Sequence, residues 1–592
     1  MENNKSDSAT ITEFKATRRQ VLGGGAMGAA AIGLAACTPL NDQPPDKVSD
    51  LKAAQRVFGL DFDEDENQLL AEALDDQLES IRAMRAQLPA NDEPPACTFS
   101  PQLKTRTYAA QDGSVALNSS ALIPPFPGID SEDAVAFAPL THLAHWVRTG
   151  QTTSAQLTSL YLRRILKHNP KLECFVTVTA DLAMAQAKQA DNEIAAGHYK
   201  GPLHGIPYGV KDLMDVAGVP TSWGAAPYKD RVAKGDAHIV TLLRDAGAVL
   251  LGKTTCGALA WGDTWFGGVT RNPWNTLEGA SGSSAGSGSA TSAGLVGFAI
   301  GTETLGSIVS PSNRNGITGL RPTFGRVGRS GTMALCWSLD KIGPMCRGVE
   351  DTALVLAVLN GPDQNDPANL PHGFSYNGNM DLSGMRIGLD PSAYEAGNDL
   401  DKQAMDTAKD VMASLGAKIV EVSTPTRDVS PLGLQLSVEA AAAFQDLTLS
   451  GRDDELRRQV RNAWPHVFRE AHMVSAVDLV QVDRLRRLVM QDMAEMFDSC
   501  DVLIGPNYAN EMLLITNYTG QPQLSLPCGF EERELDVAWS DPGQPLVAPA
   551  GTMGNMTRNI SCWAPLYEER RLIAVGRHLE AAYGMTDKHP TL

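Results

Sequence analysis

The chain is predicted to be an α/β protein with one large mixed β-sheet and helices on both of its faces. Short apolar runs, such as residues 206–210 and 248–252, have the length of buried strands. Segments with helical periodicity, such as residues 140–148 and 154–168, alternate with them. The composition, 43% hydrophobic and 20% charged, is that of a globular protein. Alternation of this kind is typical of mixed or parallel sheets covered by helices.

The expected elements follow from these periodicities. In the first half, helices are expected at 140–148, 154–168, 182–196 and 238–246, and strands at 206–210 and 248–252. Thr153 or Ser154 is expected to open the second helix and Asp181 to cap the third. In the second half, strands are expected at 385–389 and 418–422, a helix at 400–415, and mostly helix over 436–500. The Ala/Gly-rich segment 289–300 is expected to form one buried helix.

The segment before residue 136 is expected to be an extension of the main body. Residues 38–50 are rich in Pro and Asp and predict a tether. A helix is expected from Asp63, which can form a capping box with Glu66. Its apolar stripe predicts an arm that packs on the main body, through Leu70, Leu74, Leu78, Ile81, Arg85 and Leu88. Residues 96–135 are expected to be irregular.

The first residues resemble an export signal rather than part of the fold. Arg18 and Arg19 precede a weakly apolar run, as in a twin-arginine signal. Leu34-Ala-Ala-Cys37 resembles a lipobox, so Cys37 is expected to be lipidated and to anchor the chain to a membrane. The predicted location is the periplasmic face or outer membrane of a bacterium. The alternatives are an ordinary cytoplasmic tail in which the two arginines occur by chance, and a signal that is cleaved without lipidation.

The net charge and the cysteine spacing argue against a nucleic-acid-binding protein and against a zinc protein. The formal net charge is −19, and no dense Lys/Arg run follows the first twenty residues, so nucleic acid is not an expected partner. Eight cysteines follow Cys37 and none forms C-x-x-C, so a zinc site is not expected and most should be buried as small apolar residues. Neither a metal nor another cofactor is expected, and a homodimer is left open.

Three segments carry the residues of a candidate site. The Gly/Ser run 279–290 is either a flexible linker or a rigid loop that approaches a ligand, and its apolar flanks favour the loop. Lys211 follows an apolar strand; it either pairs with Asp212 or is desolvated enough to act as a base. Gly306 before Ser307 allows a tight turn, on which the N–H groups of residues 304–307 can converge as an oxyanion hole.

These motifs together resemble the amidase signature family. The family pattern matches GIPYGVKD around Lys211, SGSSAGS around Ser283, and GTETLGS ending at Ser307, which lies 24 residues after Ser283. Further matching segments are 316–327, 338–345, 517–529 and the start of a closing helix at 565–569. The resemblance covers about residues 136–585. Together with the export-signal motifs, it gives the expected organisation: a signal peptide at 1–37, a tether and helical extension at 38–135, and an amidase domain at 136–585.

The resemblance implies hydrolysis of an amide, or of an ester, by a Ser–cis-Ser–Lys triad. Ser307 would be the nucleophile, Ser283 on a cis peptide bond would relay the proton, and Lys211 would be the base. The oxyanion hole would consist of the backbone N–H groups of Thr304, Leu305, Gly306 and Ser307. The family often has glycine at the position of Leu305, and an arginine two or three residues after the nucleophile, where this chain has Val309 and Ser310. A neutral or apolar acyl group is therefore expected.

Three other functions agree less well with the sequence. Ser284 also lies in a G-x-S-x-G pattern, which would indicate an α/β-hydrolase elbow, but the residues before it are not strand-like. Within the family, the alternative is the A component of a glutamyl-tRNA amidotransferase, against which the export signal and the acidic charge argue. A binding module without activity would be expected to lack triad residues, and all three are present.

Overall fold

The computed structural model describes residues 46–118, 123–536 and 549–592. The chain divides into two compact units, the first ending at Leu78 and the second running from Glu79 to Leu592. The predicted export signal and Cys37 lie outside the described residues, so export and lipidation stay predictions. Within the described ranges, no helix has both the length and the apolar character needed to cross a membrane.

The first unit contains two helices, α1 (Lys47–Phe58) and the greater part of α2 (Glu64–Arg85). The predicted capping box is confirmed, because Asp63 and Glu66 each accept the other's backbone N–H at 2.9 Å. The predicted tether is wrong for residues 47–50, where Asp46 caps α1 by accepting the N–H of Ser49. Packing of the α2 stripe on the rest of the chain stays a prediction.

The second unit is built on the predicted mixed sheet. Its strands, in spatial order, are β12 (Lys418–Glu421), β11 (Arg386–Leu389), β13 (Val502–Pro506), β15 (Met553–Trp563), β14 (Gln523–Glu534), β8 (Thr318–Arg321), β9 (Lys341–Cys346), β7 (Phe298–Glu303), β3 (Pro207–Lys211), β4 (Val249–Thr254) and β2 (Phe175–Val178). β3 lies parallel to both β4 and β7, and β7 lies antiparallel to β9. Two short pairs stand apart: β1 (Val115–Ala116) with β10 (Tyr376–Asn377), and β5 (Thr264–Trp265) with β6 (Gly268–Val269).

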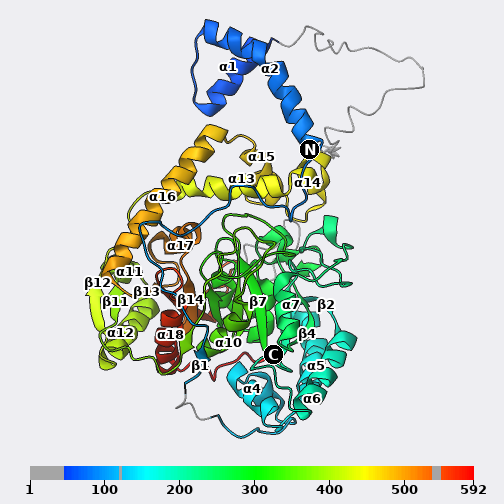
Figure 1. Cartoon of the computed structure of the whole chain (residues 1–592), viewed down its shortest axis with the longest axis vertical. Coiled ribbons are helices and arrows are strands. Elements are labelled where there is room, and N and C mark those ends of the chain that lie inside the picture. The colour runs from blue at the N-terminus through cyan, green and yellow to red at the C-terminus, as the bar shows by residue number, and fades with distance from the viewer. Residues whose placement is uncertain (1–45, 119–122, 537–548) are drawn as a thin grey trace, which may run out of the picture. The chain divides into compact units, whose positions relative to one another are not determined.

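Helices pack on this sheet and beside it (Figure 1). Their bounds are α3 (Glu132–Ala136), α4 (Leu140–Arg148), α5 (Ser154–Leu172), α6 (Ala180–Ala195), α7 (His238–Asp245), α8 (Ala285–Ser292), α9 (Val309–Asn315), α10 (Val349–Leu359), α11 (Pro391–Ala396), α12 (Asp399–Ser414), α13 (Gly433–Ala443), α14 (Gln445–Ser450), α15 (Trp464–Ala471), α16 (Ala476–Ser499), α17 (Met512–Thr519) and α18 (Glu569–Tyr583). Helices α8 and α9 contact each other and the central strands, and so do α10 and α18. The predicted fold class is confirmed.

Two local predictions are wrong. Residues 289–300 do not form one helix, because α8 ends at Ser292 and β7 begins at Phe298. The left-handed backbone of Gly294, with φ of 61°, turns the chain between them, and β7 then completes the sheet between β3 and β9. Asp181 does not cap α6, since it lies inside that helix, whose N-cap is Thr179.

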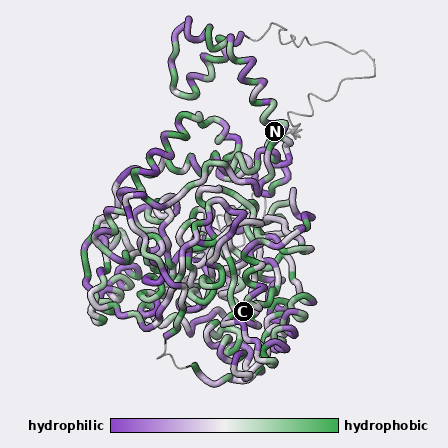
Figure 2. The backbone as a smooth tube through the Cα atoms, in the orientation of Figure 1, coloured by the Kyte–Doolittle hydropathy of each residue, from purple (hydrophilic) through white to green (hydrophobic). Residues whose placement is uncertain are grey.

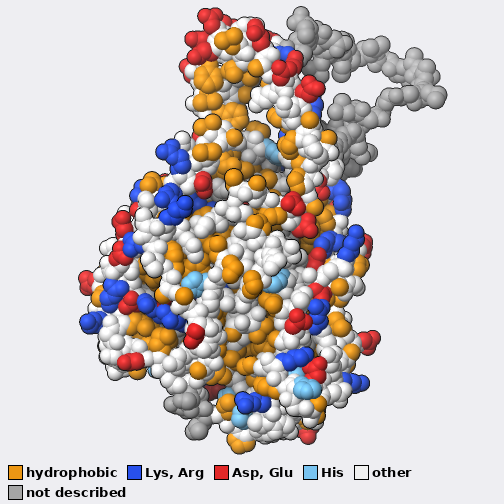
Figure 3. Space-filling view, viewed as in Figure 1, with side chains coloured by type: hydrophobic (Ala, Val, Ile, Leu, Met, Phe, Trp, Pro, Cys, Tyr) orange, Lys and Arg blue, Asp and Glu red, His pale blue; other side chains and the backbone are white. Residues whose placement is uncertain are grey.

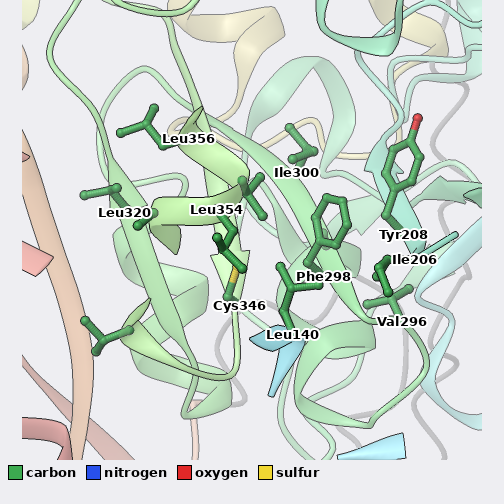
Figure 4. Close-up of a cluster of buried hydrophobic side chains, with 14 of the residues drawn as sticks. Leu140, Ile206, Tyr208, Val296, Phe298, Ile300, Leu320, Cys346, Leu354 and Leu356 are labelled. Carbon is green, nitrogen blue, oxygen red and sulfur yellow. The ribbon is translucent and has the colours of Figure 1, made fainter. Parts of the chain in front are cut away.

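The core lies between the central strands and the helices that cover them (Figure 4). Tyr208 of β3 and Phe298 of β7 stack with ring centroids 5.3 Å apart, and both are buried. The amphipathic α16 alternates in hydropathy (Figure 2), with Val489 buried and Val480 exposed. All seven described cysteines other than Cys97 are buried and none forms a disulfide, which confirms that most are small apolar core residues.

Candidate active site

Lys211 stands at the end of β3, inside the molecule. Its side chain is completely buried, and Nζ donates hydrogen bonds to three hydroxyl groups: Ser283 at 2.7 Å, Thr302 at 2.8 Å and Ser284 at 3.1 Å. It forms no ion pair with any described residue. The alternative pairing with Asp212 does not occur, because Asp212 forms its ion pair with Lys253 at 3.0 Å.

The surroundings of Lys211 favour its neutral form. Removing an ammonium group from water without a carboxylate partner costs free energy, so a buried lysine loses its proton more readily. Burial lowers the pKa of Lys211 to about 7. A substantial fraction of the side chains is therefore neutral at pH 7 and can accept a proton.

The two central serines of the Gly/Ser loop have different environments. The Gly282–Ser283 peptide bond is cis, as the family resemblance implied, and the Ser283 hydroxyl is the one closest to Lys211 Nζ. Ser284 instead holds the loop in place. Its Oγ donates to the carbonyl of Thr302 at 3.0 Å and accepts the N–H of Thr302 at 3.1 Å, while its own N–H donates to the carbonyl of Ser307 at 3.2 Å.

Ser307 lies in the turn between β7 and α9 and lines an open cleft. Gly306 before it has φ of 86°, and a Cβ there would lie 2.9 Å from Ser310 Oγ, so the predicted glycine turn is confirmed. No hydrogen bond joins the hydroxyls of Ser283 and Ser307 in this structure. Catalytic hydrogen bonds are often long in unliganded sites and shorten in the substrate complex.

The backbone N–H groups of residues 304–307 are available to stabilise a negative charge. Outside the strand and helix ladders, no described acceptor takes the N–H of Thr304, Leu305, Gly306 or Ser307. The next two N–H groups, of Ile308 and Val309, both donate to Glu303 Oε2, at 2.8 and 2.9 Å. The turn thus leaves unused donors beside the Ser307 hydroxyl, which is the arrangement an oxyanion requires.

Glu303, which the sequence did not single out, anchors this turn from inside the protein. It is completely buried, pairs with Arg321 at 2.8 Å and accepts a hydrogen bond from Asn517 at 2.8 Å. Burial alone would raise the pKa of Glu303, but the charge of Arg321 and the donated hydrogen bonds lower it to about 2. The sequence carries no spacing pattern that marks this role, because the segment before Glu303 was expected to be a helix and not a strand.

Replacing Glu303 with glutamine is expected to destabilise the protein, because the guanidinium of Arg321 would stay buried without a counter-charge. Breaking a buried ion pair from one side costs about 3–5 kcal/mol. Denaturant unfolding followed by tryptophan fluorescence measures the loss. As the matched control, Asp492→Asn breaks the more exposed pair with Arg427 and should cost about 1 kcal/mol or less. Equal losses in the two variants would contradict the anchoring role.

Asp340 supports the other end of the turn. Its carboxylate accepts the hydroxyl of Thr304 at 2.6 Å and the N–H groups of Leu335 and Cys336 at 2.8 and 3.0 Å. Burial raises the pKa of Asp340. The side chain of Thr304 is thereby tied to the segment before β9.

The cleft beside Ser307 has a volume of about 360 Å³. Its walls are largely apolar, and Trp261 and Trp464 meet edge to face with centroids 4.4 Å apart. Of the two positions where the family often has arginine, Val309 is buried away from the cleft and Ser310 lines it. Charged side chains occur at one part of the wall, where Asp263, Arg314 and Asp536 line it.

Comparison with known proteins agrees with the fold and the motifs. A family model described as Amidase matches residues 156–546, and the chain belongs to the amidase signature family. The A component of the glutamyl-tRNA(Gln) amidotransferase of Azoarcus sp. (strain BH72) is 34% identical over 458 residues, covering 68% of this chain and 93% of that protein. The corresponding protein of Chromohalobacter salexigens is 33% identical over 495 residues, covering 76% of this chain and 97% of its own length.

Solved structures share the fold. The peptide amidase of Stenotrophomonas maltophilia is 27% identical, with a TM-score of 0.64, over 77% of this chain and 98% of that chain. A bacterial aryl acylamidase of the amidase signature family, at 21% identity and a TM-score of 0.65, covers 77% of this chain and 100% of its own, and supports the fold alone.

Proposed function

We propose that this amidase-family enzyme hydrolyses a carboxylic amide through an acyl-enzyme on Ser307. The observation that carries the proposal is the Lys211 side chain, which is buried, has no carboxylate partner among the described residues, and lies 2.7 Å from the hydroxyl of Ser283. A lysine in this setting serves as a general base near neutral pH. Labelling of Ser307 by a fluorophosphonate tests the proposal, and a folded protein that stays unlabelled would contradict it.

The proposed reaction moves one proton along the triad and back. Lys211 accepts the hydroxyl proton of Ser283 as Ser283 accepts that of Ser307, whose Oγ attacks the carbonyl carbon. The electron pair of the C=O bond moves onto oxygen, where the N–H groups of residues 304–307 stabilise the negative charge. When the C–N bond breaks, the proton returns from Lys211 through Ser283 to the leaving nitrogen.

In deacylation, water is the attacking nucleophile and Ser307 Oγ is the leaving group. A water molecule gives its proton along the same route to Lys211 and attacks the ester carbonyl. The C–Oγ bond then breaks, and Ser307 regains its proton while the carboxylic acid is released. The same sequence hydrolyses an ester, so a carboxylesterase activity is consistent with the triad.

The walls of the cleft support a mainly apolar acyl group. Trp261, Trp464, Leu305 and Leu436 provide apolar surface next to Ser307. Burying an apolar substrate surface contributes about 25 cal/mol per Å². Among the described residues that line the cleft, the arginine is Arg314, and it already forms ion pairs with Glu278 and Asp536.

A second candidate function is that of the A component of an amidotransferase, which the names of the curated relatives favour. The net charge of −19 argues against a tRNA-bound role, and on the face in Figure 3 basic and acidic side chains are interspersed rather than gathered into a basic field. Ammonia transfer to misacylated tRNA in the presence of partner proteins would support this candidate. Amide hydrolysis by the isolated chain supports the first.

A further inference from the structure

Asp263 is a buried carboxylate in the cleft that the proposed reaction does not use. It lies directly before β5, is 3% exposed, and lines the same cleft as Ser307. Its Oδ2 accepts the N–H of Ser281 at 3.0 Å, while Oδ1 accepts no hydrogen bond from a described residue. Asp263 also forms no ion pair with any residue that the structure describes. One carboxylate oxygen is therefore left for a ligand.

Arg314, a basic side chain that lines the cleft with Asp263, is engaged by other carboxylates. Arg314 is engaged by Glu278 at 3.2 Å and by Asp536 at 2.9 Å, and Glu278 is further bound by Arg533 at 2.7 Å. Arg314 therefore has two carboxylate partners of its own and forms no ion pair with Asp263. Burial raises the pKa of Asp263 to about 6, while the charge of Arg314 and the N–H of Ser281 hold it down. Asp263 is therefore mainly anionic at neutral pH.

We propose that the cleft selects amides that carry a primary ammonium group on an otherwise apolar body, and that Asp263 receives this group. A buried carboxylate is stable only when a cation or several donors satisfy it, and an ammonium provides three donors in a small volume. A metal ion fits less well, because the described residues contain no cluster of three or more metal-ligating side chains. The aromatic rings of Trp261 and Trp464 provide the apolar wall.

The inference rests on the proposed function in one respect, that the bound molecule is a substrate. Binding of an ammonium group can be measured without hydrolysis, so the first test does not require turnover. Benzylammonium chloride and benzyl alcohol are titrated calorimetrically into the Ser307→Ala protein and into the Ser307→Ala/Asp263→Asn protein. A hydrogen bond to a charged group contributes about 1.5–3 kcal/mol. Benzylammonium should therefore bind the Ser307→Ala protein at least about tenfold more tightly than benzyl alcohol does. Asparagine can still accept the N–H of Ser281, so the loop should be preserved while the charge is lost.

The matched control is Asp410→Asn in the Ser307→Ala background, which removes one negative charge from the exposed face of α12. The preference for benzylammonium should be kept in this control and lost in the Asp263→Asn variant. Equal binding of the two probes before any change at Asp263, or a preference that survives Asp263→Asn, would overturn the proposal.

A kinetic arm determines which side of the scissile bond carries the cation. For the acyl side, 4-(aminomethyl)phenylacetamide is compared with 4-ethylphenylacetamide. For the leaving side, N-(4-aminomethylbenzyl)acetamide is compared with N-(4-ethylbenzyl)acetamide. In one pair, the kcat/KM ratio of charged to neutral substrate should be at least about ten and should approach one in Asp263→Asn. Ratios near one in both pairs would overturn the inference, while Ser307-dependent hydrolysis of any of them would leave the proposed function standing.

Discussion

Replacing Ser307 with alanine is expected to abolish amide hydrolysis and covalent labelling by a fluorophosphonate. In the proposed reaction the acyl-enzyme forms on Ser307 Oγ, in the turn after β7 whose N–H groups have no described acceptor outside the strand and helix ladders. Loss of a serine nucleophile costs at least about 10³-fold in kcat in enzymes that work as a triad. Mass spectrometry of the labelled peptide and an amide hydrolysis assay measure both effects.

The control for this variant is Ser289→Ala. Ser289 is also buried, and lies in α8, where it donates a hydrogen bond to the carbonyl of Arg271 rather than facing the cleft. Its variant should keep both labelling and hydrolysis. Labelling that persists in Ser307→Ala, for example at Ser283, would mean that the nucleophile has been assigned to the wrong serine.

Replacing Lys211 with alanine is expected to lower kcat/KM by at least about 10²-fold, because the triad then lacks its base. Lys211→Met is the companion variant, since it keeps most of the buried volume and removes the amine. Circular dichroism and thermal unfolding should show that at least one of the two is folded. Full activity at neutral pH in either variant would contradict the role of the lysine.

The layout of the sheet follows from local patterns that the sequence displays. The apolar runs that became β3 and β4 and the periodic segments that became α4, α5 and α7 are each stabilised by neighbours in sequence as well as in space. The glycine turn at Gly306 could also be predicted, because glycine adopts a positive φ more readily than other residues do. Separate motifs in a fixed order then allowed the family to be recognised.

Features that depend on long-range packing could not be predicted. The segment 289–300 has the composition of a helix, but its second half becomes β7 because a place in the sheet lies open between β3 and β9. Asp212 stands next to Lys211 in sequence, yet pairs with Lys253 of the adjacent strand β4. Asp263 and Glu303 show no spacing pattern, and their roles appear only when burial and partners are known.

The pH dependence of kcat/KM, measured with a neutral amide, tests the lysine-base mechanism most directly. Lys211 accepts a proton only in its neutral form, and its pKa is lowered by burial to about 7. Below that pH, kcat/KM should fall by about tenfold per unit, and above it the value should reach a plateau. A neutral substrate avoids a contribution from Asp263. A rate constant that stays flat from about pH 5.5 to pH 8 would contradict a buried lysine as the base.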